Sequence, residues 1–266
     1  MADLYDEFVT PAELTGYGRE ALDEQNENEF TLSRWLPNQT LMDLRYALEN
    51  GPAGLLDVAD FRAYNAEPTF GRREGIKRIE GSLPPLGRQM TLSEYDQLIL
   101  RNAEEEVRDL LLRDAARIAN QMGRRMELAR ADALVNASVT IGTQDNPENG
   151  LQLTVEFNRP PEHEVTAATL WSDPTALLLD ELISWCDVWR DTNGADPGAF
   201  LTNQQVVRAM LKNEQIRSAI VGDTDRTRVR RSDLDALLED EGLPPIYTYE
   251  ARATVANRAT TGGRLT

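Results

Sequence analysis

The sequence feature that most constrains the fold is a long stretch of helical periodicity near the middle of the chain. Seven apolar residues recur there at intervals of three or four, which places them on one face of an α-helix. They are Val107, Leu111, Ala115, Ile118, Met122, Met126 and Ala129. Thr91 and Glu94 have the spacing of a capping box, so the predicted helix runs from Thr91 to about Leu134. Its length of roughly 60 Å exceeds that of a compact domain this size and predicts a spine across an elongated subunit.

The residues after this helix have the alternating pattern of a β-hairpin. Val139 and Ile141 alternate with polar residues on one arm, and apolar residues alternate between Leu151 and Phe157 on the other. The intervening segment 144–150 is rich in turn-forming residues. Such a hairpin covering the helix predicts an α+β arrangement in two layers.

From residue 165 the pattern predicts a second region with mixed helices and strands. A helix is expected to open at Ser172-Asp173-Pro174 and to continue through Trp189. The other expected elements are a strand at 198–202, helices at 203–210, 213–220 and 232–238, and a strand that follows 243–249 and ends near residue 255.

The first 60 residues are strongly acidic, with 13 acidic residues against three arginines. Two short helices are predicted here. One spans 11–22 with Thr10 as N-cap and Pro11 at its first position, and the other spans 40–48. Apolar residues are too sparse for an independent core, so this segment is expected to pack on its own domain or on a neighbouring subunit.

Residues 61–90 are basic instead, with six Lys or Arg against three Glu. Their many glycines and prolines exclude a long helix. Short alternating stretches at 76–79 and 88–92 predict an extended, hairpin-like loop. Its apolar side chains, such as Phe70 and Ile76, favour docking on a partner over a free surface loop.

Charge and composition exclude several classes of protein. A net charge of −17 argues against wrapping of nucleic acid, which requires a basic surface. The sequence lacks an apolar run long enough to span a membrane, and its acidic N-terminus does not resemble a secretory signal. The single cysteine, Cys186, cannot form an internal disulfide and fits a cytosolic origin.

Catalytic and metal-binding signatures are missing from the sequence. The one histidine, His163, lies in a proline-flanked polar link, where a surface position is expected. Cys186 lies on an apolar helix, which favours a buried, inert thiol. The sequence has no zinc-ligand spacing, phosphate-binding loop or nucleophile elbow. We therefore expect that the protein is not an enzyme and has no cofactor or metal site. The alternative is a carboxylate-dependent hydrolase, which is motivated only by the large number of acidic residues.

The segment 66–87, AEPTFGRREGIKRIEGSLPPLG, resembles the signature of the phage major capsid protein E family, the lambda-like capsid subunits. The segments 32–38, 153–157 and 171–174 are similar to that family as well, and they follow in the same order. The resemblance spans roughly residues 30 to 250. Chains of the family usually continue further beyond the equivalent of Tyr247-Thr248-Tyr249 than this one does.

The resemblance implies the Hong Kong 97-type capsid fold. Residues 1–54 would form an N-arm, 55–92 an extended loop, 93–165 a peripheral domain with spine helix and hairpin, and 166–266 an axial domain with the C-terminal strand. It further implies self-assembly into hexamers and pentamers of an icosahedral phage head, formed in the host cytoplasm. The expected partners are other copies, a scaffold, portal and decoration proteins, and packaged DNA by proximity.

The basic loop and the acidic arm imply the contacts between subunits. The expected contact residues are Phe70, Arg72, Arg73, Lys77, Arg78 and Arg88 in the loop and Trp35 in the arm. Opposite charges on the two segments would fix their register, although each exposed ion pair contributes only about 0–1 kcal/mol. The alternative within the same fold is an encapsulin-like compartment shell that encloses protein cargo.

Overall fold

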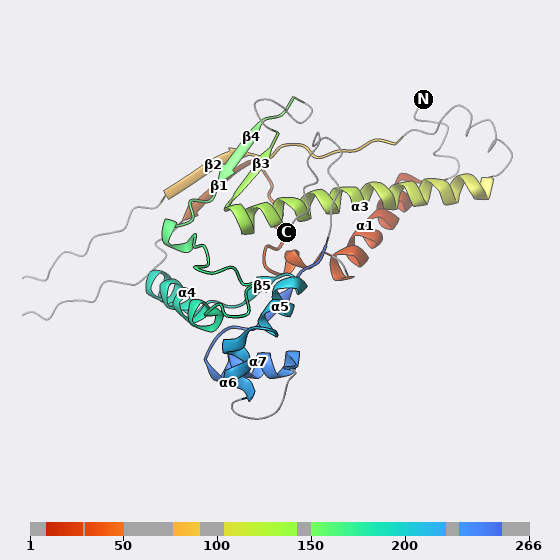
Figure 1. Ribbon diagram of the computed structural model, residues 1–266. Coiled ribbons are helices and arrows are strands. Elements are labelled where there is room, and N and C mark those ends of the chain that lie inside the picture. The colour runs from red at the N-terminus through yellow and green to blue at the C-terminus, as the bar shows by residue number, and fades with distance from the viewer. Residues whose placement is uncertain are drawn as a thin grey trace, which may run out of the picture. The chain divides into compact units, whose positions relative to one another are not determined.

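The computed structural model describes residues 9–28, 30–50, 77–90, 104–142, 150–221 and 229–251, and it contains both helices and strands (Figure 1). The chain divides into two compact units. One is formed by segments within 1–42, 84–158 and 251–265, the other by segments within 43–83 and 159–250.

The first unit is built on the long helix α3, Glu104–Asn136. Its 33 residues correspond to about 50 Å of helix, which confirms a long helix in the predicted region, and its end lies two residues beyond the expected one. The predicted capping box at Thr91 lies outside the described residues. The apolar stripe begins as expected with buried Val107, but Met126 is 44% exposed. In its place the neighbouring Glu127 and Arg130 are buried.

Helix α1, Pro11–Asn28, packs along α3 (Figure 1). Its start is the predicted one. The backbone N–H of Glu13 donates to the Thr10 hydroxyl, and the Glu13 carboxylate accepts from the Thr10 N–H at 3.1 Å. The backbone N–H and the hydroxyl of Thr10 both donate to the Glu13 carboxylate, and these two hydrogen bonds lower the pKa of Glu13. Residues 11–28 of the acidic segment therefore pack on a helix of the same chain, one of the two outcomes expected from its sparse apolar residues.

Helices α1 and α3 run parallel and approach closely where glycines remove side-chain bulk. Glu13 near the start of α1 reaches Arg108, whereas Leu22, further along α1, lies against Gly123. A Cβ atom added at Gly123 would lie 2.6 Å from Cδ1 of Leu22, and one at Gly18 would lie 3.6 Å from Cβ of Ala119. The seam between the two helices thus depends on the missing side chain at Gly123, whereas the distance at Gly18 is an ordinary van der Waals contact.

The hairpin predicted after α3 is confirmed. Strands β3, Ser138–Ile141, and β4, Leu153–Glu156, pair antiparallel with Val139 opposite Val155. Ala137 links α3 to β3 in the left-handed region with φ of 51°, and its carbonyl accepts from the N–H of Phe157. The hairpin therefore begins directly at the end of the spine helix.

In the second unit, strands β1, Arg45–Asn50, and β2, Lys77–Ser82, form an antiparallel pair. The helix predicted over 40–48 is therefore wrong. The expected pairing of 76–79 with 88–92 is also wrong, since residues 83–90 have no regular secondary structure. Pairing with a strand about 30 residues away overrides the helix-favouring Ala47 and Leu48, and local periodicity cannot reveal such a partner.

The rest of this unit is mainly helical, with α4, Leu178–Asn193; α5, Gln204–Met210; α6, Glu214–Val221; and α7, Arg231–Asp240. Strands β5, Phe200–Thr202, and β6, Ile246–Thr248, pair in parallel. Two 3-10 turns, η1 at Thr31–Arg34 in the first unit and η3 at Pro161–His163 in the second, complete the described elements. The core of the second unit comprises Leu178, Leu179, Leu182, Cys186, Val207, Met210, Ile216, Leu234, Leu238, Leu243 and Ile246.

Helix α4 begins at Leu178, so its predicted start at Ser172 is wrong. The Asp173 carboxylate instead accepts from the backbone N–H and hydroxyl of Thr175, which closes a local turn and lowers the pKa of Asp173. Asn213 then ties this turn to α6. Its side-chain amide donates to the carbonyls of Pro174 and Ala176, and its oxygen caps the N–H of Ile216.

The seam between α1 and α3 yields a stability prediction. Gly123→Leu should destabilise the protein by roughly 1–3 kcal/mol, because the added atoms would displace Leu22 and separate the helices. Urea denaturation followed by circular dichroism measures the change. Gly16→Ala on α1 is the control, because a Cβ there meets open space and should stabilise the helix by about 0.5–1 kcal/mol. Equal effects of the two substitutions would contradict the close approach at Gly123.

Candidate assembly surfaces

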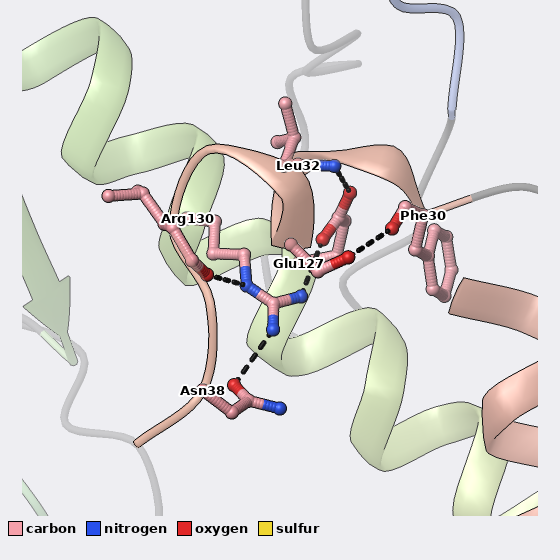
Figure 2. A network of polar contacts seen from close by, with 7 residues as sticks. Phe30, Leu32, Asn38, Glu127 and Arg130 are labelled. Carbon is pink, nitrogen blue, oxygen red and sulfur yellow. Dashed lines mark hydrogen bonds and ion pairs between the residues drawn. The ribbon is translucent and has the colours of Figure 1, made fainter. Parts of the chain in front are cut away.

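A buried ion pair on α3 is the main polar feature of the first unit. Nη1 of Arg130 donates to Oε2 of Glu127 at 2.8 Å, one helical turn away (Figure 2). Glu127 is 3% exposed and Arg130 is 7% exposed. Charged side chains are seldom buried unless every polar atom is paired, so the remaining contacts of this pair show what it does.

Three of those contacts go to the segment that follows α1. Glu127 accepts from the backbone N–H of Leu32 at 3.0 Å, and Arg130 donates from Nε to the carbonyl of Leu36 at 3.1 Å and from Nη2 to Oδ1 of Asn38 at 2.8 Å (Figure 2). Next to them, Phe30 and Leu32 are each 1% exposed. The ion pair and these apolar side chains hold residues 30–38 against α3. We call this set of contacts the arm lock.

The sequence analysis missed the arm lock. The available signal was the position of Glu127 and Arg130 beside Met126 and Ala129 in the apolar stripe. An ion pair three residues apart on a helix is ordinary on an exposed face, so its burial could not be anticipated without knowing what covers it.

Trp35, the contact residue expected in the arm, lies next to the arm lock. It is half-buried, and its backbone N–H donates to the carbonyl of Leu32. The guanidinium of Arg34 lies 5.8 Å from the centre of its ring, within the range of a cation–π contact. The arm lock therefore fixes the backbone on which Trp35 is carried.

The expected contact residues of the loop are only partly described. Phe70, Arg72 and Arg73 lie outside the described residues. Lys77 and Arg78 belong to β2, where they stand opposite Asn50 and Glu49 of β1. Arg88 is exposed, on a segment without regular secondary structure. Lys77 and Arg78 therefore lie on the same strand, whereas Arg88 follows that strand in the sequence and is not part of it.

A shallow cavity of about 310 Å³ beside α4 holds no reactive arrangement. Among its lining residues, Glu181 accepts from the backbone N–H of Ala168 and from the indole N–H of Trp171, so its carboxylate orders the preceding loop. On the same helix the thiol of Cys186 is buried as predicted, and burial raises its pKa. This cavity therefore offers no nucleophile paired with a base.

His163 is half-buried instead of lying on the surface as expected. Its ring stacks on Trp189 of α4 at a centroid distance of 5.1 Å. Within the described ranges, no three His, Cys, Asp or Glu side chains gather so that they could hold a metal ion. No helix in the same ranges is long and apolar enough to cross a membrane.

The polar contacts described above join chain segments to one another. The model of the family described as "Phage major capsid protein E" matches residues 51–265. The chain therefore belongs to the phage major capsid protein E family, which confirms the resemblance seen in the sequence. Proteins of this family are structural components of the virion shell and are not enzymes.

Two solved structures are similar to this chain at low identity. The protein described as the capsid protein of a prophage of Escherichia coli CFT073 is 16% identical, with 66% of this chain and 51% of that one covered and a TM-score of 0.40. A phage-related protein from Bordetella bronchiseptica RB50 is 15% identical, with 92% and 71% covered and a TM-score of 0.47. The match thus takes in about half the length of the first relative.

A search of curated proteins found no match. The comparisons give no support to the encapsulin-like alternative. The family assignment rests on the family model, because both structural similarities have TM-scores below 0.5.

The arm lock yields a prediction for stability. Arg130→Met should destabilise the protein by about 3–5 kcal/mol, because it leaves the Glu127 carboxylate buried without its partner. Replacing both residues, as Glu127→Leu with Arg130→Met, should cost clearly less, because no unpaired charge remains. Guanidinium denaturation of the single and double variants measures the difference.

The matched control is the more exposed ion pair between Arg231 and Asp235 on α7. Asp235→Asn should change the free energy of unfolding by about 0–1 kcal/mol. An Arg130→Met variant as stable as this control would contradict the buried role of the arm lock.

Proposed function

We propose that this protein is the subunit that assembles into the icosahedral head shell of a tailed bacteriophage and encloses its DNA. The observation that carries the proposal is the match of the capsid family model to residues 51–265. The structure supports it in that its buried polar groups hold segments in place, as an architectural role requires.

We propose further that the chain has the Hong Kong 97-type layout. Residues 1–54 form the N-arm, 55–92 the extended loop, 93–165 the peripheral domain and 166–266 the axial domain. Two features favour this layout: the long helix α3 continues directly into the β3–β4 hairpin, and strand β2 lies within the proposed loop. Both follow the order that the family resemblance implies.

Contacts between copies then depend on complementary charge. The loop is basic and the arm acidic, so a loop lying over a neighbouring arm gains favourable ion pairs that set its register. A net charge of −17 keeps the wall from adhering to packaged DNA, which is then enclosed without being bound. The proposed partners are other copies of the chain, together with scaffold, portal and decoration proteins.

Assembly of the purified full-length chain tests the proposal. Because the same surfaces are repeated on every copy, the protein should form hexameric or pentameric rings or closed shells as its concentration rises. Negative-stain electron microscopy and light scattering detect these species. A protein that remains monomeric at all concentrations and salt conditions would contradict the proposed function.

The basic loop gives a second prediction. Replacing Arg72, Arg73 and Arg78 together with glutamate should leave the protein folded, with a local cost of about 0.2–1 kcal/mol where position 78 stands opposite Glu49, but reduce shell formation severely, because like charges would then face each other between copies. Particle yield by sedimentation measures the effect, and circular dichroism checks the fold. The same three positions changed to lysine keep the charge and form the control. Normal particles from the glutamate variant would remove the electrostatic role of the loop.

A further inference from the structure

The exposed faces of α1 and α3 carry two rows of opposite charge. On α3, Arg113, Arg117 and Arg124 are exposed and stand at positions i, i+4 and i+11, which is one face of a helix. The row on α1 comprises Glu13, Glu20 and Glu24, which are exposed at positions i, i+7 and i+11. Each helix therefore presents a straight line of three like charges.

Neither row faces the seam between the two helices. In that seam α1 contributes Gly18 and Leu22, and α3 contributes Ala115, Ala119 and Gly123. At about 100° per residue, both rows are turned by roughly 100° or more from the seam. Glu13 at the end of its row also reaches Arg108 of the same chain at 3.2 Å, but Glu20 and Glu24 are exposed. The acidic row of one chain therefore cannot pair with the arginine row of the same chain.

The spacing of the two rows matches when the helices are antiparallel. Glu24 then stands opposite Arg113, Glu20 opposite Arg117 and Glu13 opposite Arg124, because intervals of four and seven residues occur in the same order on both sides. These intervals correspond to about 6 and 10.5 Å along either helix.

A parallel arrangement would align only the ends and would leave Glu20 and Arg117 three residues apart. In the antiparallel register Tyr17, which is 43% exposed, falls opposite the uncharged Asn120. One pair of like charges occurs in this register, Asp23 opposite Asp114 beside the two rows. An aromatic side chain lies near the centre of the contact, as is common at protein interfaces.

We propose that α1 of one copy docks antiparallel along the arginine row of α3 in a neighbouring copy. This inference rests on the proposed function, since it names a surface by which subunits associate. Arginine suits the contact because its guanidinium can bind a carboxylate with two hydrogen bonds. The contact joins two different surfaces, so it is heterologous, and contacts of this kind generate rings when the rotation closes.

DNA is the other polyanion that could meet an arginine row. The charge of the whole chain opposes it, because a protein with a net charge of −17 repels a phosphate backbone. The acidic helix of a second copy has the matching register as well as the charge, and the experiment below separates the two partners.

The test is a charge exchange in the full-length chain. Arg113→Glu with Arg117→Glu reverses one row, and Glu20→Arg with Glu24→Arg reverses the other. Each double variant should give about tenfold fewer particles or rings than the parent protein, because like charges then face each other. All four substitutions in one chain should restore assembly. A mixture of the two double variants should also associate, since the reversed α3 row of one variant carries the opposite charge to the reversed α1 row of the other, and the two unchanged rows are still complementary.

The control is Arg208→Glu with Arg217→Glu in the second unit, which changes the net charge as the α3 variant does and should assemble normally. Circular dichroism confirms that each double variant is folded, and the mixture keeps the test valid if the fourfold variant does not fold. Double variants that assemble like the parent, or a mixture that stays dissociated, would overturn the inference while the assembly of the parent still supports the proposed function.

Two further outcomes have defined meanings. Normal particles of the α3 variant that have lost co-purifying nucleic acid, read from the ratio of absorbance at 260 and 280 nm, would assign the arginine row to DNA and overturn the inference. A parent protein that never associates would overturn the proposed function, and the inference with it.

Discussion

The first unit depends on the buried ion pair between Glu127 and Arg130. A carboxylate and a guanidinium removed from water are tolerated only when their remaining hydrogen-bonding atoms are satisfied. Here the backbone of residues 32–36 and the side chain of Asn38 satisfy them. The pair therefore fixes the segment after α1 against the spine helix in one arrangement, because any shift of that segment would leave a buried charge without a partner.

This constraint places the other surfaces of the unit. With residues 30–38 held at one position on α3 and Gly123 allowing Leu22 to approach, α1 is fixed parallel to α3. The acidic face of α1 and the arginine face of α3 are then left on the outside at fixed positions. A charge pattern on two helices can act as a recognition surface only when the helices do not move relative to each other, and the arm lock supplies that rigidity.

Local sequence signals predicted the elements that depend on neighbouring residues. The long helix α3, the N-cap of α1 at Thr10, the β3–β4 hairpin, the helices from α5 onward and the buried Cys186 follow from periodicity, capping and turn residues, which act within a few positions. The helix predicted over 40–48 and the early start of α4 were wrong. In both cases a contact outweighed the local pattern. Residues 45–50 pair with β2, and Asp173 closes a turn where the start of α4 was expected.

The sequence by itself determined that a long helix ends near residue 134 and continues into a hairpin, the separation of acidic and basic segments, and a resemblance that the family match confirms. These properties depend on residues that are close together in the sequence, so they can be predicted without knowledge of distant contacts. Only the tertiary structure decided that Glu127 and Arg130 are buried and that β1 pairs with β2. It also decided which charged faces of α1 and α3 remain outside. Burial and strand pairing depend on which distant segment packs against a residue. For a charged side chain, removal from water by such a segment changes the free energy far more than the adjacent residues in the sequence do.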